Sequence, residues 1–414
     1  MNSSGFDPSL FHDDDGRKWL TNMVWDHRIG NHSFAGILLQ EYSEKEQRLV
    51  GAIRNIFKGT ALGLTEAPHI YKENGYYYLM TAEGGTRLEH AVTVARATSL
   101  GGPYEVDPAG PLLTSSQQPD LKLQKAGHAS LVQTQTNEWY IAHLCGRPLP
   151  QAKTCNLGRE TALQKVDWTE DGWLRLSHGG NRPALKVTPP NLPEFPFERA
   201  PAKDDFDQAE LNIHFNSLRQ PFSEEWVTLR ERPGYLRLKG RESFNSTFRQ
   251  SLIARRQQAF TIEVETVVEF LPDNFQQMAG LVYYYNTKNY YYLNISWDEE
   301  LGKRLGILSS NRGIYAEPLE REISIEGLEK CYLKALISDE RLQFYYSKDG
   351  ENWQSVGPVL DASRISDENA EMIMDDYFLD QGFTGAFIGM CVQDLSGQMK
   401  HADFDYFSYR ELDS

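Results

Sequence analysis

The sequence predicts an all-β protein in which a propeller-like region is followed by a β-sandwich. Three observations lead to this prediction. Stretches that pair an ionisable residue with an aromatic strand recur about every 60 residues in the first part of the chain. A proline-rich connector follows at residues 187–203. Beyond it, apolar and polar residues alternate in short segments separated by turns, which is typical of antiparallel sheets.

The composition indicates a globular protein and excludes several functional classes. The chain has 414 residues, of which 40% are hydrophobic and 12% aromatic, enough for two or three domains with full cores. A net charge of −16 argues against nucleic-acid binding, which requires basic surfaces. No apolar run reaches the roughly 20 residues of a membrane span, so no membrane partner is expected. The four cysteines lack metal-type spacing, so we expect reduced thiols and a cytoplasmic location.

Three similar stretches define the repeat in residues 1–186. They read FDPSLF (6–11), EAPHIY (66–71) and GHASLV (127–132). Pro8 and Pro68 are 60 residues apart, and Pro68 and Ala129 are 61 apart. The period is close to one four-stranded propeller blade with long loops. Further strands are expected at residues 76–81, 91–95, 129–133, 138–143 and 161–168, whereas residues 43–53 fit either a helix or a loop.

Residues 204–414 have the pattern of an antiparallel β-sandwich of the jelly-roll kind. Tyrosines cluster at 283–285 and 290–292. We interpret them as cross-strand packing, with stacking on a sugar as the alternative. Strands are expected at residues 261–270, 278–285, 290–297, 331–338, 342–347 and 385–393.

The repeats place Asp7, Glu66 and His128 near the starts of equivalent strands, with Glu66 one residue earlier in the repeat than Asp7. The innermost strand of each propeller blade starts near the central axis, so these side chains are expected to converge on one funnel. Two carboxylates across a pocket suit glycoside hydrolysis, because one must stay protonated while another group stays ionised. Taken singly, each residue also fits a turn, a surface position or a hydrogen-bonded core histidine.

Six motifs resemble the β-xylosidases of glycoside hydrolase family 43. They are SGFDPSLF (4–11), LTEAPH (64–69), AGHAS (126–130), LGRET (157–161), GFTGAF (382–387) and HADFDYF (401–407). The resemblance extends over essentially the whole chain. It implies a five-bladed catalytic propeller, here lacking its first blades, in residues 1–186. A linker at 187–203 and a concanavalin-like jelly-roll sandwich at 204–414 would follow.

The resemblance also implies the roles of residues in the catalytic region. Glu66 matches the general acid, and Asp7 matches the aspartate that raises the pKa of that acid and orients it. His128 matches the histidine beneath the sugar, which in some members binds a divalent cation such as calcium or magnesium. No cofactor is otherwise required. The aspartate that serves as general base in the family has no counterpart here, so we expect the chain to begin within the propeller.

Contacts to the sugar are expected from four further positions. Arg159 matches an arginine that donates to sugar hydroxyls, a task that suits its fixed fork of donors. Phe383 matches a phenylalanine at the rim of the active site, with Phe387 as the competing candidate. Phe6, next to Asp7, is expected to contact substrate.

The function implied by the resemblance is that of an inverting, exo-acting β-1,4-xylosidase in xylan breakdown. It would release xylose from the non-reducing end of xylo-oligosaccharides. One alternative is an α-L-arabinofuranosidase or a bifunctional enzyme. Others are a carbohydrate-binding protein that lacks its base, and a metal-activated hydrolase centred on His128. The family resemblance further implies a homo-oligomer.

Overall fold

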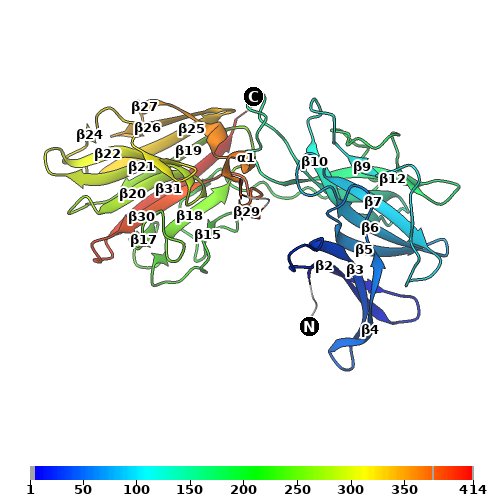
Figure 1. Ribbon diagram of the computed structural model, residues 1–414. Coiled ribbons are helices and arrows are strands. Elements are labelled where there is room, and N and C mark those ends of the chain that lie inside the picture. Colours follow the sequence, from blue (N-terminus) through cyan, green and yellow to red (C-terminus); the bar gives the residue numbers. More distant parts are fainter. Residues whose placement is uncertain (1–4, 375–376, 413–414) are drawn as a thin grey trace. The chain divides into compact units, whose positions relative to one another are not determined.

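The computed structural model describes residues 5–374 and 377–412, and strands dominate it (Figure 1). This confirms the predicted all-β class. Within the described residues, helix is limited to the turn η1 (Ala362–Arg364) and the short α1 (Asp367–Ala370). No helix in these ranges is long and apolar enough to span a membrane. Contacts divide the chain into a first unit, Met1–Arg147 with Glu160–Pro196, and a second, Pro148–Arg159 with Phe197–Ser414.

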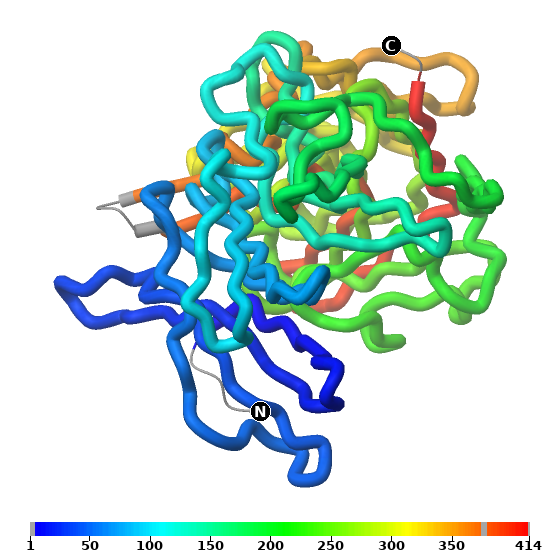
Figure 2. The backbone as a smooth tube through the Cα atoms, turned by 90° about the vertical axis from the view of Figure 1, so that its right-hand side faces the viewer, coloured from blue at the N-terminus to red at the C-terminus, as the bar shows by residue number. Residues whose placement is uncertain are grey.

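The first unit consists of three antiparallel sheets that follow one another along the chain. Their residues run from blue to green along the tube in Figure 2. The first sheet contains β1 (Phe6–His12), β2 (Lys18–Trp25), β3 (Phe34–Ser43) and β4 (Arg48–Phe57). The second contains β5 (Glu66–Glu73), β6 (Tyr76–Glu83), β7 (Ala91–Ala97) and β8 (Glu105–Val106), with β9 (Leu113–Thr114) paired to β7. The third contains β10 (Gln124–Gln133), β11 (Trp139–Gly146), β12 (Glu160–Trp168) and β13 (Leu174–Leu176).

The repeat predicted from proline spacing corresponds to these sheets, because β1, β5 and β10 each open one of them. The helical interpretation of residues 43–53 is wrong: they form the end of β3, a turn and the first half of β4. The charged residues of this segment lie on the hairpin of β3 and β4, and most positions of β4 are exposed. Their spacing reflects exposure to solvent and not the period of a helix.

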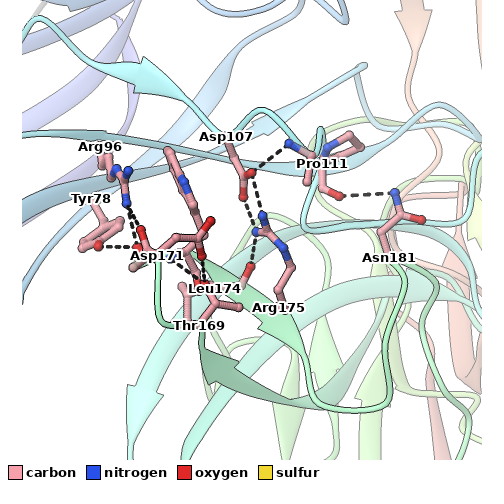
Figure 3. A network of polar contacts seen from close by, with 12 residues as sticks. Tyr78, Arg96, Asp107, Pro111, Thr169, Asp171, Leu174, Arg175 and Asn181 are labelled. Carbon is pink, nitrogen blue, oxygen red and sulfur yellow. Dashed lines mark hydrogen bonds and ion pairs between the residues drawn. The ribbon is translucent and has the colours of Figure 1, made fainter.

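Polar and cation–π contacts join the second sheet to the third (Figure 3). The Arg96 guanidinium lies 4.0 Å from the centre of the Trp173 ring and donates to the carbonyl of Asp171 at 2.6 Å. The Tyr78 hydroxyl donates to the carbonyl of Gly172 at 2.5 Å. These contacts fasten the turn between β12 and β13 to β6 and β7. They lie beside a cluster of buried apolar residues contributed by both sheets.

The second unit contains two large antiparallel sheets. In one, β14 (Lys203–Asp204), β16 (Val227–Thr228), β17 (Leu236–Lys239), β19 (Thr261–Glu269), β25 (Lys330–Ser338), β26 (Arg341–Ser347), β27 (Gln354–Asp361) and β31 (His401–Glu411) pair. The other joins β15 (Asn216–Ser217), β18 (Ser251–Arg256), β20 (Gln277–Asn286), β21 (Asn289–Asp298), β22 (Gly302–Asn311), β23 (Ile314–Ala316), β24 (Ile323–Ser324) and β30 (Phe387–Asp394). A small hairpin of β28 (Met372–Met374) and β29 (Tyr377–Asp380) is separate.

Side chains that alternate along these strands build the core of the second unit. Strand β25 alternates strictly between buried and half-exposed positions after its exposed first residue. Its inward residues join those of both large sheets in one apolar cluster. Tyr283 and Tyr291 face each other across β20 and β21 in this cluster, and Tyr284 and Tyr290 face each other in a second cluster that shares these strands. All four are buried, which confirms cross-strand packing and contradicts sugar stacking.

Truncating Phe344 should test the importance of this core. Phe344 lies on β26 and is fully buried, so Phe344→Ala is expected to cost about 3–5 kcal/mol of unfolding free energy. Urea denaturation of the full chain measures this loss. Tyr345→Ala, at the neighbouring half-exposed position, is the matched control and should cost clearly less. Equal losses would contradict the assignment of the buried face.

Residues 148–159 belong to the second unit although they interrupt the third sheet in sequence. The Glu340 carboxylate accepts hydrogen bonds from the backbone of Gln151 and Ala152 at 2.9 and 3.2 Å. The Glu368 carboxylate accepts from the Cys155 backbone at 2.7 Å. Carboxylates far along the chain therefore hold residues 148–159 in the second unit. The residue pattern of 1–186 does not predict this placement. Cys155 and the other three cysteines are buried thiols that form no disulfide.

Candidate active site

The first strand of each sheet in the first unit carries an irregularity in its pairing with the second strand. At these points Asp7, Ala67 and His128 adopt left-handed conformations, with φ of 53°, 50° and 46°. Such a conformation costs a residue with a side chain roughly 1–2 kcal/mol, so its recurrence indicates a local geometry held by the surrounding fold. The structural equivalents are thus Asp7, Ala67 and His128, and Glu66 comes one residue earlier, as the sequence spacing predicted.

Hydrogen bonds fasten β1 to β5 close to the two carboxylates. The Ser9 hydroxyl donates to the carbonyl of Pro68 at 2.6 Å, and it also lies 2.9 Å from the Thr21 hydroxyl on β2. Ser9 is two residues beyond Asp7, and Pro68 is two residues beyond Glu66. This bond therefore holds the starts of both strands together, and the charge of Asp7 acts on the carboxyl of Glu66.

Glu66 has the electrostatic properties of a general acid. Burial raises the pKa of its carboxyl to about 7, and the negative charge of Asp7 contributes in the same direction. Both causes disfavour the ionised form, since burial removes water and Asp7 repels a second negative charge. The carboxyl is consequently still substantially protonated near pH 7, where an ordinary glutamate is ionised.

Two histidines, His128 and His69, feel the charge of Asp7. Burial lowers the pKa of His128, while the charge of Asp7 opposes this shift. Burial and the neighbouring His128 lower the pKa of His69 as well, and Asp7 again opposes it. Both imidazoles are therefore neutral at pH 7 and can exchange hydrogen bonds with uncharged hydroxyl groups. His69 was not predicted as a site residue, although it is an ionisable residue within the same motif as Glu66.

The position of His128 depends on a glycine. A Cβ on Gly127 would lie 2.3 Å from the ring of His90, which is buried and approaches the carbonyl of Lys125 at 3.0 Å through Nδ1. Only glycine leaves room for this ring directly before His128. The packing of His90 thus fixes the backbone that carries His128.

The residues around His128 do not supply the ligands that a divalent cation prefers. In the part of the chain that the structure describes, no group of three or more His, Cys, Asp or Glu residues could hold a metal ion. Hard cations such as calcium and magnesium prefer several oxygen ligands. The imidazole of His128 is a poor substitute for them, so His128 does not by itself form a site for such a cation.

Phe6 lies at the start of β1, directly before Asp7, and 39% of it is exposed. Its ring centre is 6.1 Å from that of Trp25 and 6.3 Å from that of Phe34. The three rings form an aromatic cluster beside Asp7. Such rings can cover the apolar face of a sugar, and the contact between Phe6 and substrate stays a prediction.

Arg159 and Phe383 come together within the second unit. The Arg159 guanidinium lies 5.3 Å from the centre of the Phe383 ring, and the Arg159 backbone donates to the Phe383 carbonyl at 3.1 Å. Nε of Arg159 is 3.7 Å from Oδ2 of Asp367, which is buried. The competing candidate, Phe387, begins β30 and packs against the tyrosine cluster of its sheet. The contact with Arg159 therefore favours Phe383.

Two glycines allow the loop before β12 and the loop before β30 to approach each other closely. A Cβ on Gly158 would lie 2.4 Å from the backbone nitrogen of Gly385, and both glycines have φ of +70°. Asp367 supports the same junction, because its Oδ1 accepts from the Tyr285 hydroxyl at 2.7 Å and from the Gly385 backbone at 3.1 Å. Sequence reasoning missed Asp367, which lies outside every motif.

Two protein-family models match the chain. The model of the glycosyl hydrolases of family 43 matches residues 1–174, and the β-xylosidase C-terminal concanavalin A-like domain matches residues 203–410. Together they account for the two architectures seen in the structure.

Individual relatives are similar over almost the full chain. A β-xylosidase of Bacillus subtilis (strain 168) is 49% identical over 99% of this chain and 77% of that protein. Xylosidase/arabinosidase 43B of Humicola insolens is 45% identical over 100% of this chain and 76% of that protein. The crystal structure of a xylan β-1,4-xylosidase from Bacillus halodurans C-125 has a TM-score of 0.94 and 58% identity, covering 99% of this chain and 77% of that one.

Proposed function

The chain belongs to glycosyl hydrolase family 43, and we propose that it acts as an exo-β-xylosidase with Glu66 as general acid. The substrate class is a short β-1,4-xylo-oligosaccharide, cut at its non-reducing end as part of xylan breakdown. The observation that carries the proposal is the pKa of Glu66, raised to about 7 by burial and by Asp7. A group that must deliver a proton near neutrality needs such a value.

The proposed reaction is a single displacement with inversion. Glu66 gives its proton to the glycosidic oxygen as the bond from that oxygen to the anomeric carbon breaks. A water molecule forms the new bond to this carbon from the opposite face and gives up its proton to a base. Inverting enzymes need about 6.5–9.5 Å between acid and base to accommodate that water. We assign no residue of this chain to the base.

Asp7 is proposed to orient Glu66 and to sustain its raised pKa rather than to activate water. Its support is the joint between Ser9 and Pro68, which holds the starts of β1 and β5 together, and its charge effect on Glu66. A base on the opposite side of the sugar would lie farther away. Neutral His128 is proposed to bind sugar hydroxyls, with Phe6 as an apolar contact. The sugar contacts expected of Arg159 and Phe383, which belong to the second unit, stay predictions from the family resemblance.

Hydrolysis of xylobiose with release of β-linked xylose as its α anomer tests the proposed reaction. The anomer is observed by NMR within the first minutes, before mutarotation, on the xylose released from an aryl β-D-xylopyranoside, because the reducing-end xylose of xylobiose is already a mixture of anomers. We expect turnover of xylobiose and of an aryl β-D-xylopyranoside. A β anomer as first product, or no turnover of either substrate, would contradict the proposal.

An arabinofuranosidase activity is the second candidate, since the similar protein of Humicola insolens is a xylosidase/arabinosidase. Matched nitrophenyl β-D-xylopyranoside and α-L-arabinofuranoside substrates distinguish a xylosidase, an arabinofuranosidase and a bifunctional enzyme. A higher kcat/KM for the xyloside supports the main proposal.

Binding of sugar without turnover is the candidate from another class. In the described residues, Asp7 is the one carboxylate whose charge acts on the pKa of Glu66. Because Asp7 is proposed to orient the acid, the residue that would activate water remains unassigned, and binding alone is the alternative. Calorimetric titration with xylobiose, run beside the hydrolysis assay, tests this. Binding without product would favour a carbohydrate-binding role over catalysis.

We also propose a cytoplasmic location and a homo-oligomeric state. The support for the location is that the four cysteines are buried thiols outside any disulfide, because reduced thiols suit a reducing compartment. The support for the assembly is the family resemblance alone. Fractionation of cells and light scattering of the purified chain test the two proposals.

A further inference from the structure

A buried carboxylate outside the predicted site follows the strand partner of Glu66. Glu83 ends β6 and is 0% exposed. Oε1 of Glu83 accepts hydrogen bonds from the Thr60 backbone at 2.8 Å and from the Thr65 hydroxyl at 2.7 Å. Oε2 accepts from the Thr60 hydroxyl and, at 2.9 Å, from the Thr93 hydroxyl. These four donors fill the lone-pair sites of a carboxylate.

The donors on Thr60 and Thr65 belong to the loop that leads into β5. Thr65 precedes Glu66 directly, and Glu66 pairs with Ala82, the neighbour of Glu83. Gly84, the residue after the end of β6, donates through its backbone N–H to the carbonyl of Gly63 at 2.9 Å. Hydrogen bonds from the end of β6 therefore hold the loop 60–65 at Thr60, Gly63 and Thr65.

The local backbone of Glu66 requires such support. Leu64 and Ala67, on either side of it, both adopt left-handed conformations, with φ of 51° and 50°. Residues with side chains keep this conformation when their surroundings over-determine it. Thr65, between Leu64 and Glu66, is 2% exposed and its hydroxyl donates to Glu83.

Gly59 is independent evidence that Thr65 and Glu83 pack closely against the start of the loop. Its φ is +86°, and a Cβ there would lie 1.9 Å from the Thr65 hydroxyl oxygen and 3.0 Å from Oε1 of Glu83. The loop thus begins with a residue whose missing side chain leaves room for the bond between Thr65 and Glu83.

We propose that Glu83 is a positioning residue for the proton transfer: through Thr60 and Thr65 it holds the loop 59–65 and thereby fixes the direction of the Glu66 carboxyl. This inference rests on the proposed role of Glu66 as the acid. Glu83 itself does not touch the substrate. Its effect is to keep the acid in one orientation, and small displacements of catalytic groups are costly to rate.

The test removes one hydroxyl and keeps the shape of the side chain. Thr65→Val should lower kcat on xylobiose on the order of tenfold with KM little changed, and Thr65→Ser should restore it. An aryl xyloside with an acidic phenol should lose much less, because its departure needs little proton transfer. Tyr78→Phe is the stability control: it removes a buried hydroxyl bond of the same unit, at 2.5 Å to Gly172, away from the site.

Equal loss on both substrates, or the same loss in Tyr78→Phe at a matched melting temperature, would overturn the inference. A second readout does not depend on turnover. The pKa of Glu66, measured by NMR of carboxyl-labelled protein, should fall from about 7 toward its ordinary value in Thr65→Val, as a loosened side chain gains water. An unchanged pKa in that variant would overturn the inference even if the chain hydrolysed no xyloside, an outcome that by itself counts against the proposed function.

Discussion

Glu66→Ala is expected to lower kcat on xylobiose by about 10²–10⁴-fold, the usual cost of losing a general acid. The departing sugar oxygen is a poor leaving group and needs the proton from Glu66. An acidic phenol departs as a stable anion, so an aryl xyloside with such a group should retain most of its rate. Steady-state kinetics on both substrates measure the difference.

Glu73→Ala is the matched control for this substitution. Glu73 lies at the other end of the same strand, β5, and should leave both rates close to those of the unmodified chain. If Glu66→Ala slowed the two substrates equally, the missing group would act in binding or folding and its assignment as acid would be wrong.

Asp7→Asn is expected to move the alkaline limb of kcat/KM to lower pH. The limb reports the ionisation of the acid in the free enzyme, and the pKa of Glu66 is about 7 with Asp7 contributing to the increase. Removing this negative charge makes ionisation of Glu66 easier and lowers its pKa. Burial, the larger cause, remains, so the pKa should stay above that of an exposed glutamate.

The sign of the effect follows from the form that acts. Only protonated Glu66 can donate, so activity falls as pH rises through its pKa, and it falls earlier in Asp7→Asn. Well above the limb, each unit by which the pKa is lowered removes about tenfold of the active form. Asp14→Asn, on the exposed turn between β1 and β2, is the control. A limb that stays in place in Asp7→Asn, or moves to higher pH, would contradict the like-charge account.

The parts of the fold that local pattern determines were predictable from the sequence. The small residues and prolines after Asp7, Glu66 and His128 marked the three strands that open the sheets. Strict alternation predicted β25, and the tyrosines of β20 and β21 pair across the strands as expected. In each case the information lies in neighbouring residues, because strands alternate their faces with a period of two.

Features that depend on distant partners were not predictable. Residues 148–159 leave the first unit because Glu340 and Glu368, about 190 to 210 residues later, accept their backbone hydrogen bonds. The left-handed φ of Ala67 has no local signal, since alanine rarely adopts it alone. Glu83 likewise resembles any strand-terminal glutamate until its threonine donors are seen.

The most direct test of the account is the pKa of the Glu66 carboxyl in the intact chain. NMR titration of carboxyl-labelled protein, with the Glu66 signal assigned by its absence in Glu66→Gln, gives this value without an activity assay. The account predicts a pKa near 7 and a lower value in Asp7→Asn. An ordinary glutamate value in both proteins would show that Glu66 is neither buried nor faced by Asp7, and would contradict the proposed catalytic pair.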